Sequence, residues 1–152
     1  MRTDALSRND WIVGGLALLL VIDLLFLPWF SFSFGNISVT TTATGSFDGW
    51  TAILAMLAAL AVLADLLFER LSPETTLPNF GGSRTATRFR LSVIAVAFVA
   101  LKFVLHIHFS NFSIGFYAAV VIGAALVFST MRLSQDREIL GTTTTTTTPT
   151  IP

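Results

Sequence analysis

Four apolar stretches dominate the chain, and each is about as long as a helix that crosses a bilayer. A transmembrane helix needs about 20 mostly apolar residues to cross about 30 Å of hydrocarbon, and it satisfies its backbone hydrogen bonds internally. Apolar residues make up 53% of the 152 residues, and charged residues only 12%. We therefore predict an all-α polytopic membrane protein, a bundle of four transmembrane helices. The predicted spans cover about residues 11–28, 50–68, 91–109 and 113–131.

The same composition excludes several classes of protein. The chain has no Cys, so it is not a disulfide scaffold, and its apolar content is far too high for a disordered chain. Its formal net charge is zero and it contains no basic run, which excludes a nucleic-acid binder. The lipid bilayer is therefore the first expected partner, and no nucleic acid is expected.

The arginines indicate an orientation in the membrane, because basic residues near the ends of spans favour the cytoplasmic side. Residues 29–49 and 110–112, which follow the first and third spans, contain no Lys or Arg. We therefore predict that both termini are cytoplasmic. The excess of Arg over Lys and the many Ala residues suggest a bacterial inner membrane. The arginines at the predicted inner end are Arg2, Arg8, Arg70, Arg84, Arg88, Arg90, Arg132 and Arg137.

The remaining segments complete the predicted organisation. Residues 1–10 form a cytoplasmic N-terminus, and residues 11–140 form the transmembrane domain. Residues 69–90 are rich in Pro and Gly and are typical of an irregular connector. Residues 141–152 contain seven consecutive Thr followed by Pro-Thr-Ile-Pro, with no periodicity. We predict that this Thr-rich segment is a disordered cytoplasmic tail.

The first outer connection has the pattern of a short strand pair. Its Phe residues alternate with Ser31 and Ser33, and Gly35-Asn36 is a turn signal. We expect a short extended or β-like cap on the outer face, rich in aromatic residues. The cap is either an interfacial aromatic belt or a hydrophobic surface for a lipid or a partner subunit. Its aromatic residues are Trp29, Phe30, Phe32, Phe34, Phe47 and Trp50.

Two ionisable residues lie at nearly the same depth inside predicted spans. At 1.5 Å per residue, Asp23 lies about 18 Å and Lys102 about 16–17 Å from the cytoplasmic edge. Because their charges are opposite, we predict an ion pair between the first and third spans. The pair either fixes helix register or forms a proton-responsive centre in a transport path. Alternatively, Lys102 extends outward beside His106 and leaves Asp23 alone.

Other polar residues lie near the two membrane boundaries. Asp65 is near the inner boundary, where we predict that it pairs with Arg88 or Arg90. His106 and His108 lie at the outer end of the third span. Their spacing points them about 200° apart on a helix, which is poor for binding one metal ion. They are weak metal candidates, with only Asp48 as a further ligand, so polar anchoring at the interface is the expected role.

Small residues predict close helix packing. Gly115, Ala119 and Gly123 recur every fourth residue in the fourth span, and Ala55 and Ala59 do so in the second. Such faces let helix backbones approach closely in lipid. A face that is not used inside the bundle is available for self-association or for another membrane subunit.

No catalytic pattern is present in the sequence. It contains no Cys nucleophile, Walker loop, GxSxG, HExxH or CxxCH motif, and its serines have no base in register. We therefore predict that the protein is not an enzyme and has no cofactor.

Two motifs carry a resemblance to known proteins. Pro28-Trp29-Phe30-Ser31 after the first span and Phe47-Asp48-Gly49-Trp50 before the second resemble those of small uncharacterised four-span membrane proteins of actinobacteria. That resemblance implies a four-span fold and no activity. In size and span number the chain is also similar to small multidrug-resistance transporters, where Asp23 is the counterpart of the acidic residue of the first helix. That family has Glu there and minimal loops, so the outer loop and tail are departures from its pattern.

Three functions follow from these features. The first is a non-catalytic accessory or scaffolding subunit of an inner-membrane complex, which binds other subunits or itself. The alternative is a small oligomeric proton-coupled transporter or lipid or drug exporter, with Asp23 as the coupling carboxylate and Lys102 as its partner. The third is an outer-face metal or ligand sensor that uses His106 and His108.

Overall fold

The computed structural model describes residues 8–71, 83–106 and 112–143, with side chains for all of them except residues 70 and 136–143. Four helices and two strands form in this part of the chain, which is mostly helical as predicted. In chain order they are α1 (Arg8–Phe26), β1 (Pro28–Phe34), β2 (Ile37–Thr42), α2 (Gly49–Leu71), α3 (Arg84–Leu105) and α4 (Ile114–Thr143).

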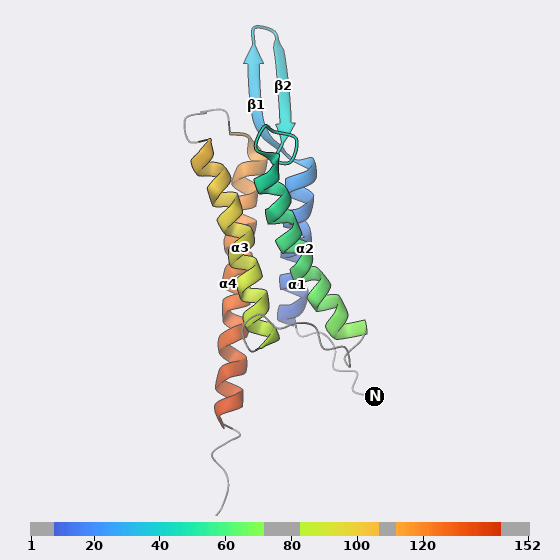
Figure 1. The fold of residues 1–152 in the computed structure, drawn as a ribbon, viewed down its shortest axis with the longest axis vertical. Coiled ribbons are helices and arrows are strands. Elements are labelled where there is room, and N and C mark those ends of the chain that lie inside the picture. Colours follow the sequence, from blue (N-terminus) through green and yellow to red (C-terminus); the bar gives the residue numbers. More distant parts are fainter. Residues whose placement is uncertain (1–7, 72–82, 107–111, 144–152) are drawn as a thin grey trace, which may run out of the picture.

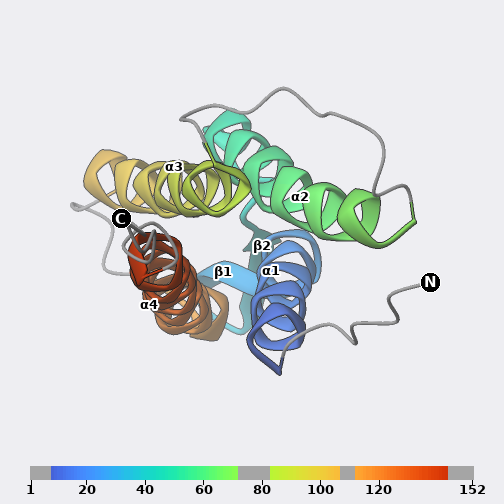
Figure 2. The ribbon, with the colours of Figure 1, turned by 90° about the horizontal axis from the view of Figure 1, so that it is seen from below.

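The four helices run side by side along the long axis of the molecule, alternating in direction (Figure 1). Seen end on, they occupy the corners of a square in chain order, so that α1 contacts α2 and α4 while α3 lies diagonally opposite (Figure 2). The antiparallel β1–β2 hairpin projects beyond one end of the bundle, and α4 continues past the other helices at the opposite end (Figure 1). The two ends of the bundle are therefore structurally distinct.

Three of the described helices are long and apolar enough to cross a membrane: the segments Arg8–Phe26, Gly49–Glu69 and Ile114–Gln135. Helix α3 is not among them. Arg84, Arg88 and Arg90 lie in its first two turns and Lys102 in its last turn, so its apolar part is short. A fourth span remains a prediction, and it requires that the charged side chains of α3 are shielded from lipid by other parts of the protein.

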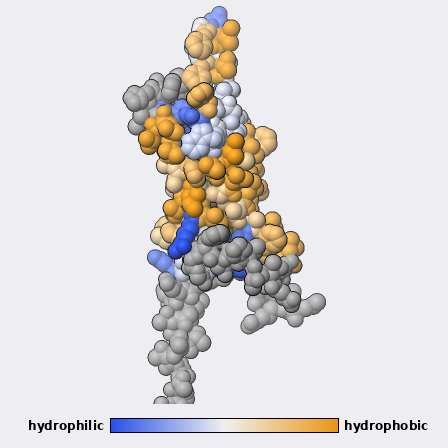
Figure 3. Space-filling view, in the orientation of Figure 1, coloured by the Kyte–Doolittle hydropathy of each residue, from blue (hydrophilic) through white to orange (hydrophobic). Residues whose placement is uncertain are grey.

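The helices are apolar on their outer faces as well as in the core. In α1, the buried residues Val13, Ala17, Leu20 and Leu24 follow helical spacing. Large apolar residues of α1, α2 and α4 face outward, and in the view of Figure 3 hydrophobic residues cover the middle of the bundle. A helix that is hydrophobic on all sides is typical of a core helix or a membrane span.

Small residues bring the helices together, as their spacing predicts. Ala55, Ala59 and Ala119 are fully buried. A Cβ atom added at Gly123 would lie 2.9 Å from Cγ2 of Val96 on α3. Within the described residues, these faces are therefore used inside the bundle.

Several boundaries differ from those predicted. Helix α1 ends at Phe26 because Pro28 follows, and the residue before a proline is disfavoured in helices. Helix α3 begins at Arg84, inside the predicted connector, because the Ser83 side chain caps it by accepting a hydrogen bond from the Ala86 N–H at 3.1 Å. Helix α4 extends to Thr143, past both the predicted end of the span and the start of the predicted tail.

The outer connection forms the β-like element that the Phe–Ser alternation predicts. Phe32 pairs with Val39 and Phe34 with Ile37, whereas the intervening pairs consist of Ser and Thr. Gly35 occupies the turn with a φ of 61°, a left-handed conformation that favours glycine. The hairpin therefore has one apolar and one hydroxyl-bearing face.

Replacing Gly115 with Ala should destabilise the junction between the hairpin and α4. The added Cβ would lie 2.7 Å from Cδ1 of Trp29 and 2.8 Å from the carbonyl oxygen of Pro28. We expect a loss of about 1–3 kcal/mol, measured as the free energy of unfolding in detergent titrations. Gly15→Ala is the matched control, because nothing lies within 4 Å of a Cβ there. Equal stability of the two variants would contradict this packing.

Candidate functional site

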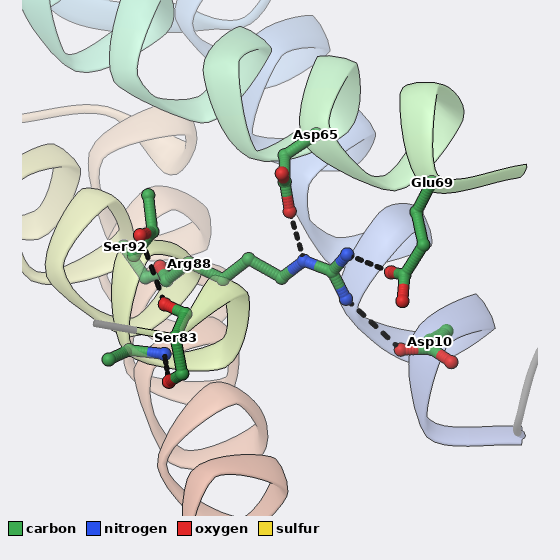
Figure 4. Close-up of polar contacts among 8 residues, drawn as sticks. Asp10, Asp65, Glu69, Ser83, Arg88 and Ser92 are labelled. Atoms are coloured by element: carbon green, nitrogen blue, oxygen red, sulfur yellow. Dashed lines mark hydrogen bonds and ion pairs between the residues drawn. The ribbon is translucent and has the colours of Figure 1, made fainter. Parts of the chain in front are cut away.

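Polar side chains gather in two clusters at opposite ends of the helices. The inner cluster is centred on Arg88 of α3, which is only 1% exposed. Its Nε donates to Oδ2 of Asp65 at 2.5 Å, its Nη1 to Oδ1 of Asp10 at 3.4 Å, and its Nη2 to Oε2 of Glu69 (Figure 4). One guanidinium thus binds three carboxylates from two other helices.

Local structure explains why these groups meet. Asp65 and Glu69 are four residues apart on α2 and so share one face, and Asp10 lies in the first turn of α1. Burial lowers the pKa of Arg88, and the hydrogen bonds with Glu69 and Asp65 raise it by a larger amount. The pKa of Arg88 therefore lies above its ordinary value. The Ser92 hydroxyl donates to the backbone carbonyl of Arg88 at 2.9 Å, within α3 (Figure 4). The guanidinium itself is held in place by its three carboxylate partners.

This cluster confirms one prediction and extends it. Asp65 pairs with Arg88, whereas Arg90 lies on the exposed side of α3. Asp10 and Glu69 were not predicted as partners of Arg88. The signal was available, because Asp10 lies at the predicted inner boundary and Glu69 lies one turn after Asp65.

The outer cluster surrounds Lys102 of α3, which is also 1% exposed. Its Nζ donates to Oγ of Ser46 at 2.7 Å and to the carbonyl oxygen of Asp48 at 3.0 Å. The ammonium also lies 5.8 Å from the ring centroid of Phe30. Lys102 therefore ties α3 to the loop between β2 and α2 and to β1, mostly through neutral acceptors.

Asp23 has a different partner, so the predicted Asp23–Lys102 ion pair is wrong. Trp29 Nε1 donates to Oδ2 of Asp23 at 3.1 Å, and Oδ1 has no hydrogen-bond partner among the described residues. The position of a residue along its helix gives its depth in the membrane, but it does not show which neighbouring helix the side chain faces. Because α1 and α3 lie at opposite corners, their equal height does not bring Asp23 and Lys102 together (Figure 2).

His106 caps the C-terminus of α3 beside Lys102. Its Nδ1 lies 3.0 Å from the Lys102 carbonyl oxygen, and its Nε2 lies 3.5 Å from Oδ2 of Asp48. His108 lies outside the described residues. In the part of the chain that the structure describes, no three His, Cys, Asp or Glu side chains are grouped to hold a metal ion.

The six predicted cap residues range from fully buried to fully exposed. Trp29 and Phe30 are buried at the base of the hairpin, where Phe30 bridges to Phe112 and the Ser113 N–H donates to the Trp29 carbonyl at 2.8 Å. The Phe116 ring packs edge-on against Trp29, with centroids 5.8 Å apart. Phe32 is half-buried, whereas the outer members are exposed. These are Phe34 at 74%, Phe47 at 100% and Trp50 at 51%.

Removing the Arg88 charge should strongly destabilise the bundle. In Arg88→Gln, three carboxylates lose a buried cation, and breaking such a pair costs about 3–5 kcal/mol. Arg90→Gln, on the exposed side of the same helix, should cost less than about 1 kcal/mol. The free energy of unfolding in detergent measures both. Similar values for the two variants would contradict the central role of Arg88.

A double-mutant cycle tests the separation of Asp23 from Lys102. Asp23→Asn and Lys102→Met remove groups that share no hydrogen-bond partner. Their effects on the free energy of unfolding should therefore add within about 0.5 kcal/mol in the double variant. Rescue of one substitution by the other would instead indicate a direct ion pair.

The two clusters are thus polar contacts between elements of the fold, with one carboxylate oxygen of Asp23 left over. Comparison of the chain with protein-family models, with curated proteins and with solved structures finds no match.

Proposed function

We propose that the chain is a non-catalytic integral membrane protein with four transmembrane helices. In this proposal it acts as an accessory or scaffolding subunit of a bacterial inner-membrane complex. Three apolar helices support insertion.

Helix α3 suits a span that packs among other helices. Lys102 and Arg88 are each 1% exposed and bound to neighbouring elements of the chain. Arg90 is exposed and lies at the inner boundary of the predicted span. Beyond it, Val93, Ile94 and Leu101 face outward. Lipid would therefore meet apolar side chains over residues 91–101, as a membrane span requires.

The distribution of charge supports an orientation with the hairpin outside. Arg88 lies near the start of α3, and that end of the helix is opposite the hairpin (Figure 1). Basic residues near span ends favour the cytoplasmic side, and residues 29–49 contain none. In this orientation both chain termini are cytoplasmic.

The scaffolding role is proposed because the hairpin projects from the bundle and exposes apolar side chains. It stands beyond the ends of the helices, and hydrophobic residues extend along it (Figure 3). Phe34 and Ile37 are 74% and 68% exposed there. An exposed apolar surface that stands away from the bundle is suited to contact with another protein.

Substitutions in the hairpin test this role. Native mass spectrometry of the protein, released directly from vesicles of its own membrane without detergent, should find it with other subunits or copies in fixed stoichiometry. Phe34→Ser combined with Ile37→Ser should release a folded monomer, because both exposed apolar contacts are lost. Ser33→Thr combined with Ser38→Thr, on the opposite face, should leave the assembly intact. A wild-type chain that is monomeric, or a Phe34/Ile37 variant that stays assembled, would contradict the proposal.

One observation favours proton-coupled transport as a second candidate. Asp23 is 1% exposed, and its Oδ1 has no hydrogen-bond partner among the described residues. Intramembrane carboxyls of this kind are found in proton relays. Asp23→Asn should then abolish proton-coupled flux in vesicles while the variant still folds. Unchanged flux, or no flux in the wild type, would count against transport.

A further inference from the structure

We propose that the exposed apolar face of the hairpin is covered by the same face of a second copy of this chain. The apolar hairpin face comprises Phe32, Phe34, Ile37 and Val39. The dimer would be joined outside the membrane, face to face about a two-fold axis. This inference rests on the proposed scaffolding function, since it names the partner of the hairpin.

The register of the strands places these four side chains together. Phe32 lies opposite Val39, and Phe34 lies opposite Ile37. Because side chains alternate between the faces of a strand, these two pairs share one face, while the Ser31–Thr40 and Ser33–Ser38 pairs share the other. The first face is well exposed, with Phe34 at 74%, Ile37 at 68% and Val39 at 49%.

Charge favours a second copy over a charged partner. Residues 28–42 contain no Asp, Glu, Lys, Arg or His. A charged surface docked on this face would lose water and find no counter-charge, which is costly. The same face of another copy is equally apolar and uncharged, and a two-fold axis makes one patch complementary to itself.

A two-stranded hairpin also needs further packing, because such a hairpin is at best marginally stable in water. The bundle supports only its base, where Trp29 and Phe30 are buried and Phe30 bridges to Phe112. Toward the turn, the described residues of the chain leave the apolar face uncovered. Two hairpins stacked about 10 Å apart, the usual distance between packed sheets, would cover it.

The size of the face indicates where the dimer forms. A large aromatic side chain buries roughly 150–250 Å², so four partly exposed apolar side chains supply on the order of 400 Å² per copy. A stable interface needs about 800 Å² per partner. The contact is therefore too small for a dimer in dilute detergent, and it depends on anchoring both copies in one membrane, which raises their effective concentration.

Cysteine cross-linking tests the proposal directly, because the chain has no Cys. Val39→Cys and Thr40→Cys place single thiols on opposite faces of the same strand. A short bis-maleimide reagent, added to native membranes, should double the apparent mass of Val39→Cys and leave Thr40→Cys monomeric. Gln135→Cys, at the far end of α4, reports random collision and should also stay monomeric. Adding Phe34→Ser to Val39→Cys should abolish the cross-link.

Two results would overturn the dimer. No cross-linking of Val39→Cys means that the face is not covered by a second copy. Equal cross-linking of Val39→Cys and Thr40→Cys means that copies join by strand edges instead. If Val39→Cys fails while the Phe34/Ile37 double variant still releases a foreign subunit in native mass spectrometry, the dimer is refuted and the scaffolding function stands. If Val39→Cys does not cross-link and no foreign subunit is released, both the dimer and the scaffolding function are refuted.

Discussion

The bundle depends on the ion pairs that the Arg88 guanidinium makes with three carboxylates. A cation that is almost completely buried is tolerated only when it is paired and hydrogen-bonded. Asp10 of α1 and the two carboxylates of α2 supply those bonds. Three helices are thereby fixed in rotation and height at one end, while α4 joins by close packing, as at Gly123.

The opposite end is held by neutral acceptors and aromatic rings rather than by carboxylates. Lys102 reaches a hydroxyl and a backbone carbonyl, and Trp29 folds back onto Asp23. Both contacts lie at the base of the hairpin. The direction in which the hairpin projects is therefore set by its contacts with the helices at its base.

Periodicity and hydropathy were enough to predict the four helices and the hairpin. The Phe–Ser alternation gives a strand with one apolar face, and Gly35 permits the turn. The Asp65–Arg88 pair also followed, since both residues lie at one boundary and carry opposite charges.

The ion pair predicted for Asp23 and Lys102 failed for a physical reason. Rise per residue fixes the depth of a side chain, but which helices are neighbours depends on packing across the whole bundle. The start of α3 and the end of α4 failed for another reason. Residues 84–90 at the end of the predicted connector contain no Pro or Gly, so the helix begins directly after the Ser83 cap, and α4 runs on beyond its apolar stretch.

The most direct test of this account is the side of the membrane on which each end lies. Single cysteines at Asn9, Ser38 and Gln135 can be labelled with a membrane-impermeant maleimide in right-side-out vesicles, because the chain has no other Cys. Four spans with the hairpin outside predict labelling of Ser38→Cys at once, and of Asn9→Cys and Gln135→Cys only after permeabilisation. Labelling of Asn9→Cys and Gln135→Cys from opposite sides would mean an odd number of spans and would contradict the account.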